Sequence, residues 1–165
     1  MQIRELLLPE VDDEMRKTRA TLERVPEGVP DFKPHTKSMP MARLAAHLAQ
    51  LPVFGSTILS TPELDFSTSG MQPLTMESRE QLLRAFDGHV QQTRAKLAEA
   101  SDDELQQPWK LSFGGKIIVE GTRYQVLRTL MINHIIHHRA QLGVYLRLNE
   151  IPVPSIYGPT ADEAI

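Results

Sequence analysis

Proline constrains the fold of this sequence more than any other residue type. The chain has 12 prolines among 165 residues, and most of them gather in the stretches 26–40, 52–73 and 152–159. Because proline lacks a backbone N–H and its ring clashes with the preceding helical turn, these clusters interrupt helices. The stretches between them carry apolar residues at the three- and four-residue spacing of a helix face. The pattern therefore predicts four helical segments joined by long connections.

The first predicted helix begins near Pro9, a residue type that suits the first turn of a helix. Asp12, Asp13 and Glu14 then place negative charge near the positive end of the helix dipole. An apolar stripe continues from this point to Val25. The four predicted helices cover approximately the ranges 9–25, 39–51, 75–100 and 122–148.

Local signals set the other helix boundaries. Ser38 is expected to be the N-cap of the second helix, with Pro40 in its first turn and Pro52 as its end. The third helix is expected to begin around Thr75, although Ser78 stands where a complete capping box would have glutamate.

A short β-hairpin is predicted before the last helix. The stretches Trp109–Phe113 and Lys116–Glu120 flank the pair Gly114-Gly115, which suits a tight turn. Four helices with one small hairpin predict an all-α fold, most simply a four-helix bundle. The length indicates a single domain over residues 1–165.

Composition excludes several functions. The net charge of −3 offers no general attraction to phosphate backbones, so nucleic acid is not an expected partner. The longest apolar runs are too short to span a bilayer, so a membrane is not expected either. The chain has no cysteine, which excludes disulfides, thiolate catalysis and iron–sulfur clusters, and which favours a cytoplasmic location. Any metal must therefore be held by histidine and oxygen.

His134 and His138 stand one turn apart on the predicted last helix. Such a pair can present two imidazole nitrogens to one cation. Both lie on the core-facing stripe, and buried imidazoles need partners for their ring nitrogens. A shared metal is one solution. One alternative is that the two histidines are a buried pair held by hydrogen bonds. The other is that this helix face borders a solvated cleft.

His47 lies at the border of the apolar face of the second helix. A histidine in this position is commonly a core residue with satisfied hydrogen bonds. Together with His134 and His138, however, it would complete a set of three ligands with positions left for water, which is the pattern of a catalytic metal site.

Three further side chains are candidates to support such a site. Gln141 turns back toward the histidine face and could orient a ligand or bound water. His137 projects at the edge of the stripe and is either a supporting or a surface histidine. His89, on the third helix, is a fourth ligand, a supporting partner or a plain core histidine.

Two arginines lie close to these histidines in the sequence. Arg139 points away from the histidine face and is expected to be structural. Arg43, one turn before His47, either meets an anionic substrate or is solvated.

The last predicted helix also carries a second apolar patch, formed by Ile132, Ile136 and Gly143. A helix that is apolar on two faces is either fully buried or packs against another chain. We expect a homodimer that uses this face, the alternative being burial under the loops that link the helices.

Three segments resemble the DinB/YfiT-like superfamily: LLLPEVDDEMRKTRATLERVP at 6–26, PHTKSMPMARLAAHLAQLP at 34–52, and NHIIHHRAQLGVYLRLNEIPVPSIYGPTADE at 133–163. The resemblance implies a four-helix bundle with up-down-down-up connections, often dimeric. It also implies a divalent metal, commonly zinc or nickel, bound by three histidines, which here correspond to His47, His134 and His138. Phe54 and Ala140 depart from the residues that are commoner in the family, and neither change touches a ligand.

The family includes thiol S-transferases that use bacillithiol and a mycothiol-dependent maleylpyruvate isomerase. The leading hypothesis is therefore a metal-dependent enzyme that acts on a small-molecule substrate, with a low-molecular-weight thiol as cofactor. One alternative is a non-catalytic metal-binding or stress-response bundle. Another is a helical scaffold with no metal.

Overall fold

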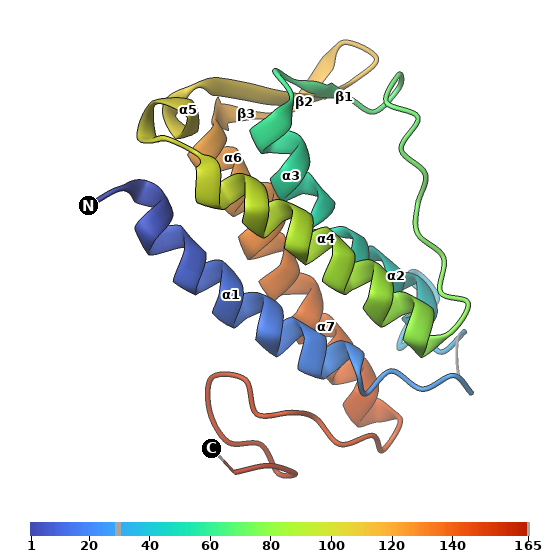
Figure 1. The fold of residues 1–165 in the computed structure, drawn as a ribbon. Coiled ribbons are helices and arrows are strands. Elements are labelled where there is room, and N and C mark those ends of the chain that lie inside the picture. Colours follow the sequence, from blue (N-terminus) through green and yellow to red (C-terminus); the bar gives the residue numbers. More distant parts are fainter. Residues whose placement is uncertain (29–30, 165) are drawn as a thin grey trace.

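Helices make up most of the chain, and a small sheet lies at one end of them (Figure 1). The structure is a computed structural model and describes residues 1–28 and 31–164 of the predicted domain. In chain order, its elements are α1 (Ile3–Leu22), α2 (Met41–Gln50), α3 (Val53–Ser60), β1 (Leu64–Asp65), α4 (Arg79–Glu99), α5 (Asp102–Gln106), β2 (Pro108–Phe113), β3 (Lys116–Thr122), α6 (Arg123–Leu127), the π-helical segment η1 (Arg128–Asn133) and α7 (His134–Leu148).

The longer helices enclose one hydrophobic core. α1 packs against α4 and α7, and α2 packs against the same two helices. Figure 1 shows that α1 and α7 run away from the sheet, whereas α4 runs back toward it. Fully buried side chains such as Met15, Leu48, Phe86 and Leu142 supply the core from all four helices.

The first helix begins earlier than predicted, because α1 starts at Ile3 and contains Pro9 in its interior. The Glu5 carboxylate accepts a hydrogen bond from the Gln2 N–H at 2.9 Å, which holds this earlier start. Pro9 is exposed, as is Glu5. The carbonyl that loses its helical partner at Pro9 is therefore accessible to water. The acidic run at 12–14 consequently lies in the third turn, far from the helix N-terminus.

Pro52 ends one helix and begins another, which the sequence pattern did not predict. Ser38 does not cap α2, since Pro40 occupies the N-cap position. Pro52 occupies the equivalent position of α3, where its missing N–H costs no helical bond. Two hydroxyls of this helix bond within it: Ser56 Oγ and Thr57 Oγ1 both donate to the Val53 carbonyl, at 3.0 and 2.9 Å.

The third long helix, α4, begins at Arg79 rather than at Thr75. Ser78 is its N-cap, and its hydroxyl accepts from the Gln81 N–H at 3.1 Å. The short helix α5 was not predicted. It follows directly and is capped by Ser101, whose hydroxyl accepts from the Glu104 N–H at 3.2 Å.

The last predicted helix is continuous from α6 through η1 to α7, but its middle is not α-helical. Thr122 caps its start and accepts from the Gln125 N–H. The six residues of η1 then adopt a π-helix that ends immediately before His134. Pure α-helical periodicity does not indicate such a segment, and π-helical turns are frequent at functional sites.

The predicted hairpin is present and belongs to a larger sheet. β2 and β3 are antiparallel, and Gly114 and Gly115 adopt φ values of 56° and 82° in the turn. β1 adds a third strand that runs parallel to β2. The Asp65 carboxylate ties this strand to the turn, because it accepts from the backbone N–H groups of Gly114 at 3.1 Å and Gly115 at 3.2 Å. The fold is thus mostly helical, as predicted, but the sheet has a third strand where only a hairpin was expected.

The predicted dimer face is partly covered by the chain itself. Ile132 is fully buried, so it is not available to a second chain. A Cβ on Gly143 would lie 3.8 Å from Val153 of the C-terminal segment, and Ile136 is partly buried against the core. All three positions therefore face this chain's own residues at least in part, and a homodimer stays a prediction.

Across residues 1–28 and 31–164, none of the helices has both the length and the apolar character that crossing a membrane requires.

Candidate metal centre

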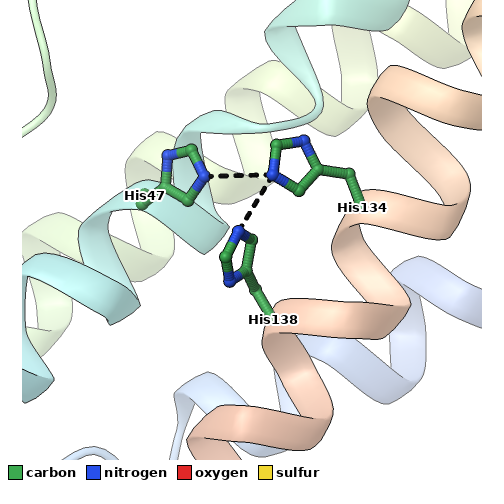
Figure 2. A group of neighbouring side chains, drawn as sticks. All are labelled: His47, His134 and His138. Carbon is green, nitrogen blue, oxygen red and sulfur yellow. Dashed lines mark hydrogen bonds between the residues drawn. The ribbon is translucent and has the colours of Figure 1, made fainter. Parts of the chain in front are cut away.

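Three histidine rings from two helices meet at one point (Figure 2). His47 comes from α2, and His134 and His138 come from consecutive turns of α7. The Nε2 atom of His134 lies 3.4 Å from that of His47 and 2.9 Å from that of His138. One ring nitrogen from each residue lies within 4.8 Å of the other two. The structure therefore brings together the three histidines that the sequence singled out.

Packing between α2 and α7 creates this meeting. Leu44 and Leu48 of α2 are fully buried on either side of His47, which turns that side chain toward α7. His47 and His134 are half-buried, whereas His138 is 8% exposed. The group thus has a buried side and a side open toward solvent.

The spacing of the nitrogens suits a shared metal ion. Two nitrogen ligands about 2.0–2.1 Å from a zinc ion lie about 3.3 Å apart at a tetrahedral angle and about 2.9 Å apart at a right angle. The observed separations of 3.4 and 2.9 Å match these two values.

Hydrogen bonds between the three rings cannot give every Nε2 atom a good partner. His134 Nε2 faces both other Nε2 atoms, but a neutral ring nitrogen either donates once or accepts. At least one pair would be left without a good hydrogen bond, whereas a cation accepts a lone pair from every ring. The donor set therefore fits a divalent ion.

Burial keeps the three imidazoles neutral. Burial first, and then the neighbouring charges of His138, His134 and Arg43, together lower the pKa of His47 to about 4. Burial also lowers the pKa values of His134 and His138 below the usual range for histidine. Neutral imidazole is the form that binds a metal, so the group is in its ligating form at neutral pH.

A neighbouring side chain holds one of the rings in a suitable tautomer. Gln141 Oε1 lies 2.7 Å from Nδ1 of His138. An amide oxygen only accepts, so Nδ1 donates and the lone pair remains on Nε2. The backbone of Leu130, inside η1, acts on the His134 ring in the direction that raises its pKa, which opposes the larger effect of burial. Gln141 thus contacts a candidate ligand, and its role in orienting that ligand stays a prediction.

The other two candidate histidines do not join the cluster. The His137 ring packs against that of His138 with centroids 4.8 Å apart, but its side chain is exposed. His89 Nδ1 bonds to the Ala49 carbonyl at 3.1 Å, which ties α4 to α2. In the part of the chain that the structure describes, the only group of three or more potential ligands is the histidine cluster.

A pocket of about 500 Å³ opens beside His47. We call it the α2 pocket, and it is lined by Met39, Arg43, His47, Gln50, Leu51, Phe54, Phe66, Met71, Gln72, Pro73, Leu74 and Phe113. Its size suits a small molecule, and its lining is mainly apolar, as is usual for such sites. A ligand in this pocket would therefore lie against one of the candidate metal ligands.

A buried ionic cluster on the other side of α7 was missed by sequence reasoning. Arg139 is 3% exposed, and its guanidinium pairs with the Glu14 carboxylate at 2.7 Å. The Tyr157 hydroxyl donates to the same carboxylate at 2.7 Å and accepts from Arg139 at 2.6 Å. Arg139 is structural, as expected. Its partners were unrecognised because Glu14 was assigned to the charged first turn of α1.

Comparisons with known proteins agree on one family. A sequence model of the DinB family matches residues 1–164. A comparison with curated proteins finds no match.

Solved structures with the same fold come from several bacteria. A DinB-like protein from Bacillus subtilis has a TM-score of 0.68 at 18% identity, covering 92% of this chain and 97% of its own. A DinB-like protein from Bacillus cereus ATCC 10987 has a TM-score of 0.67 at 20% identity, covering 88% and 92%. A protein described as a DinB family member from Exiguobacterium sibiricum 255-15 has a TM-score of 0.62 at 21% identity, covering 98% of both chains. At these identities the likeness concerns the fold alone.

Proposed function

This chain belongs to the DinB family, as its residues predicted, and we propose that it is a metal-dependent enzyme. His47, His134 and His138 would hold one divalent ion, zinc or nickel. The observation that carries the proposal is the convergence of their Nε2 atoms, at 2.9 and 3.4 Å, from two separate helices. Three protein ligands leave coordination positions for a substrate, as in catalytic rather than closed structural sites.

The residues around the cluster suit this role. A divalent ion bound here would supply Lewis acidity and would lower the pKa of a water or thiol that it holds. Gln141 keeps the proton of His138 on Nδ1, so that Nε2 remains available. The α2 pocket lies beside His47, and its mainly apolar walls would contact the apolar part of a substrate.

The proposed reaction class is that of a thiol-dependent S-transferase or isomerase. The chain has no cysteine, so the sulfur of such a reaction must come from a low-molecular-weight thiol. The resemblance to family members that use such thiols supports this choice.

The proposal has an architectural part as well. It treats residues 1–165 as one domain, a four-helix bundle with up-down-down-up connections that acts as a homodimer in the cytoplasm. The mutual packing of α1, α2, α4 and α7 supports the bundle. The absence of cysteine supports the location.

Metal content tests the proposal first. Wild-type protein from medium supplemented with zinc and nickel should carry a stoichiometric divalent ion when measured by mass spectrometry of the digested protein. His134→Ala should lose that ion. His137→Ala is the matched control, because this neighbouring histidine is exposed and lies outside the cluster. An ion-free wild type, or an ion that remains in His134→Ala, would refute the proposed site.

Activity separates an enzyme from a non-catalytic metal-binding or stress-response protein. Low-molecular-weight thiols are screened against a panel of electrophiles, with and without chelator. An enzyme should show turnover that chelator and His47→Ala abolish while the fold is retained. A metal that raises the melting temperature but supports no turnover with any thiol would favour the non-catalytic protein.

A further inference from the structure

The α2 pocket contains a single permanent charge, and it is positive. Its lining includes Arg43 and His47, but no aspartate or glutamate. The protein as a whole has a net charge of −3, so this local balance differs from that of the rest of the chain. Arg43 is therefore the only arginine, lysine, aspartate or glutamate side chain that lines the pocket.

Arg43 has no ion pair or side-chain hydrogen bond with any residue in 1–28 or 31–164. Several other arginines are paired, for example Arg94 with Asp12 at 2.8 Å and Arg128 with Glu10 at 2.8 Å. A guanidinium has five N–H donors in a planar fork that matches a carboxylate. In the α2 pocket this fork is available to a ligand.

The remaining walls are apolar and held in place. Phe54 and Phe66 pack edge to face with centroids 6.0 Å apart. Gln50 uses both ends of its amide to anchor the opposite wall: it donates to the Gln72 carbonyl at 2.7 Å and accepts from the Leu74 N–H at 2.9 Å. Because these polar groups are already satisfied, the wall offers a ligand mainly apolar contacts.

We propose that the α2 pocket binds a small monocarboxylate with an apolar chain or ring, its carboxylate on Arg43 and its apolar part against Phe54 and Phe66. This inference rests on the proposed function, of which it names the substrate class. Arg43 precedes His47 by one helical turn, so their Cβ atoms are about 5–6 Å apart. The reacting group would thus lie only a few atoms from the carboxylate.

A single carboxylate fits the charge of the pocket better than a phosphate group. One guanidinium balances one negative charge through two parallel hydrogen bonds. In the metal-free protein, a phosphate dianion would keep one charge that the exposed Arg43 does not balance, beside phenylalanine, leucine and methionine side chains, which is unfavourable.

Matched acid and amide probes test the proposal. Octanoate and 4-phenylbutyrate, each with its uncharged primary amide, are titrated calorimetrically into zinc-loaded and metal-free protein. We expect each acid to bind at least tenfold more tightly than its amide, in both forms of the protein. Arg43→Gln should remove this preference, and Arg43→Lys should retain part of it. Arg79→Gln is the control, because Arg79 is an exposed arginine outside the pocket.

Two results would overturn the proposal. The first is equal binding, or no binding, of acid and amide in the wild-type protein. The second is an acid preference that survives Arg43→Gln but disappears when zinc is removed, since the carboxylate would then bind the ion rather than Arg43. Zinc content is measured in the same samples. A wild type that holds no zinc but shows an Arg43-dependent preference would refute the metal site and leave the carboxylate pocket standing.

Discussion

Replacing Gly55 by alanine should destabilise the protein strongly, because α3 approaches α4 and η1 closely at this residue. A Cβ at position 55 would lie 2.7 Å from Sδ of Met131 and 2.8 Å from Oγ1 of Thr93, and closer still to Cγ2 of Thr93. Carbon atoms do not pack at such distances, so the neighbours would have to move. Met131 is flexible and can adapt. Thr93 is the residue that resists.

Thr93 is fully buried and is held by two hydrogen bonds. Its hydroxyl donates to the Pro52 carbonyl and accepts from the Ser56 N–H at 2.8 Å. Overpacking a core costs about 1–3 kcal/mol. Displacing the Thr93 side chain would in addition lose two hydrogen bonds worth about 0.5–1.5 kcal/mol each. Alanine favours a helix by about 1 kcal/mol relative to glycine. The net expectation is a loss of about 1–5 kcal/mol in the free energy of unfolding.

Urea unfolding followed by circular dichroism measures this loss, and thermal melting gives a second readout. For a chain of this size, each kcal/mol changes the melting temperature by about 2–4 °C, so a decrease of about 2–20 °C is expected. Gly88→Ala is the matched control, because Gly88 lies inside α4 and a Cβ at this position would have no neighbouring atom within 4 Å. It should gain up to about 1 kcal/mol. A Gly55→Ala variant that is as stable as the wild type would refute the reasoning.

Two further predictions concern charges. Arg139→Met should lower the free energy of unfolding by about 1.5–3 kcal/mol, measured by urea titration, because the buried carboxylate of Glu14 loses its closest cation and keeps only Lys17, whose Nζ lies 3.7 Å away; a loss below about 1 kcal/mol would contradict this. The metal-free protein should lose stability as the pH falls from about 6.5 toward 4, since the pKa of His47 is about 4 in the folded state and near 6.5 when unfolded. His47→Gln should flatten this part of the curve of melting temperature against pH, and an unchanged slope would count against the pKa shift.

Local patterns were sufficient for much of the fold. The i, i+4 spacing of His134 and His138 puts both rings on one face of any helix that contains them. The pair Gly114-Gly115 indicated the hairpin turn, because only glycine adopts two successive positive φ values without strain. These features depend on residues within a few positions of one another.

Features that depend on distant residues were partly or wholly missed. Pro52 was interpreted as the end of a helix, but whether a new helix follows depends on what α3 can pack against, here α4. The π-helical segment η1 cannot be recognised from the spacing of apolar residues, and it ends directly before His134. Glu14 was interpreted as an acidic residue in the first turn of the first helix. Only the packing of α7 against α1 brings it next to Arg139.

The sequence alone determined that two imidazoles share a helix face, that any metal must be held without thiolates, and which residue of α2 could supply a third nitrogen. Only the tertiary structure decided that His47 Nε2 comes within 3.4 Å of His134, and that one arginine and three phenylalanines line the adjoining pocket. The physical reason is that helix periodicity is set by local hydrogen bonds, whereas the approach of α2 to α7 is set by packing of side chains from the whole core.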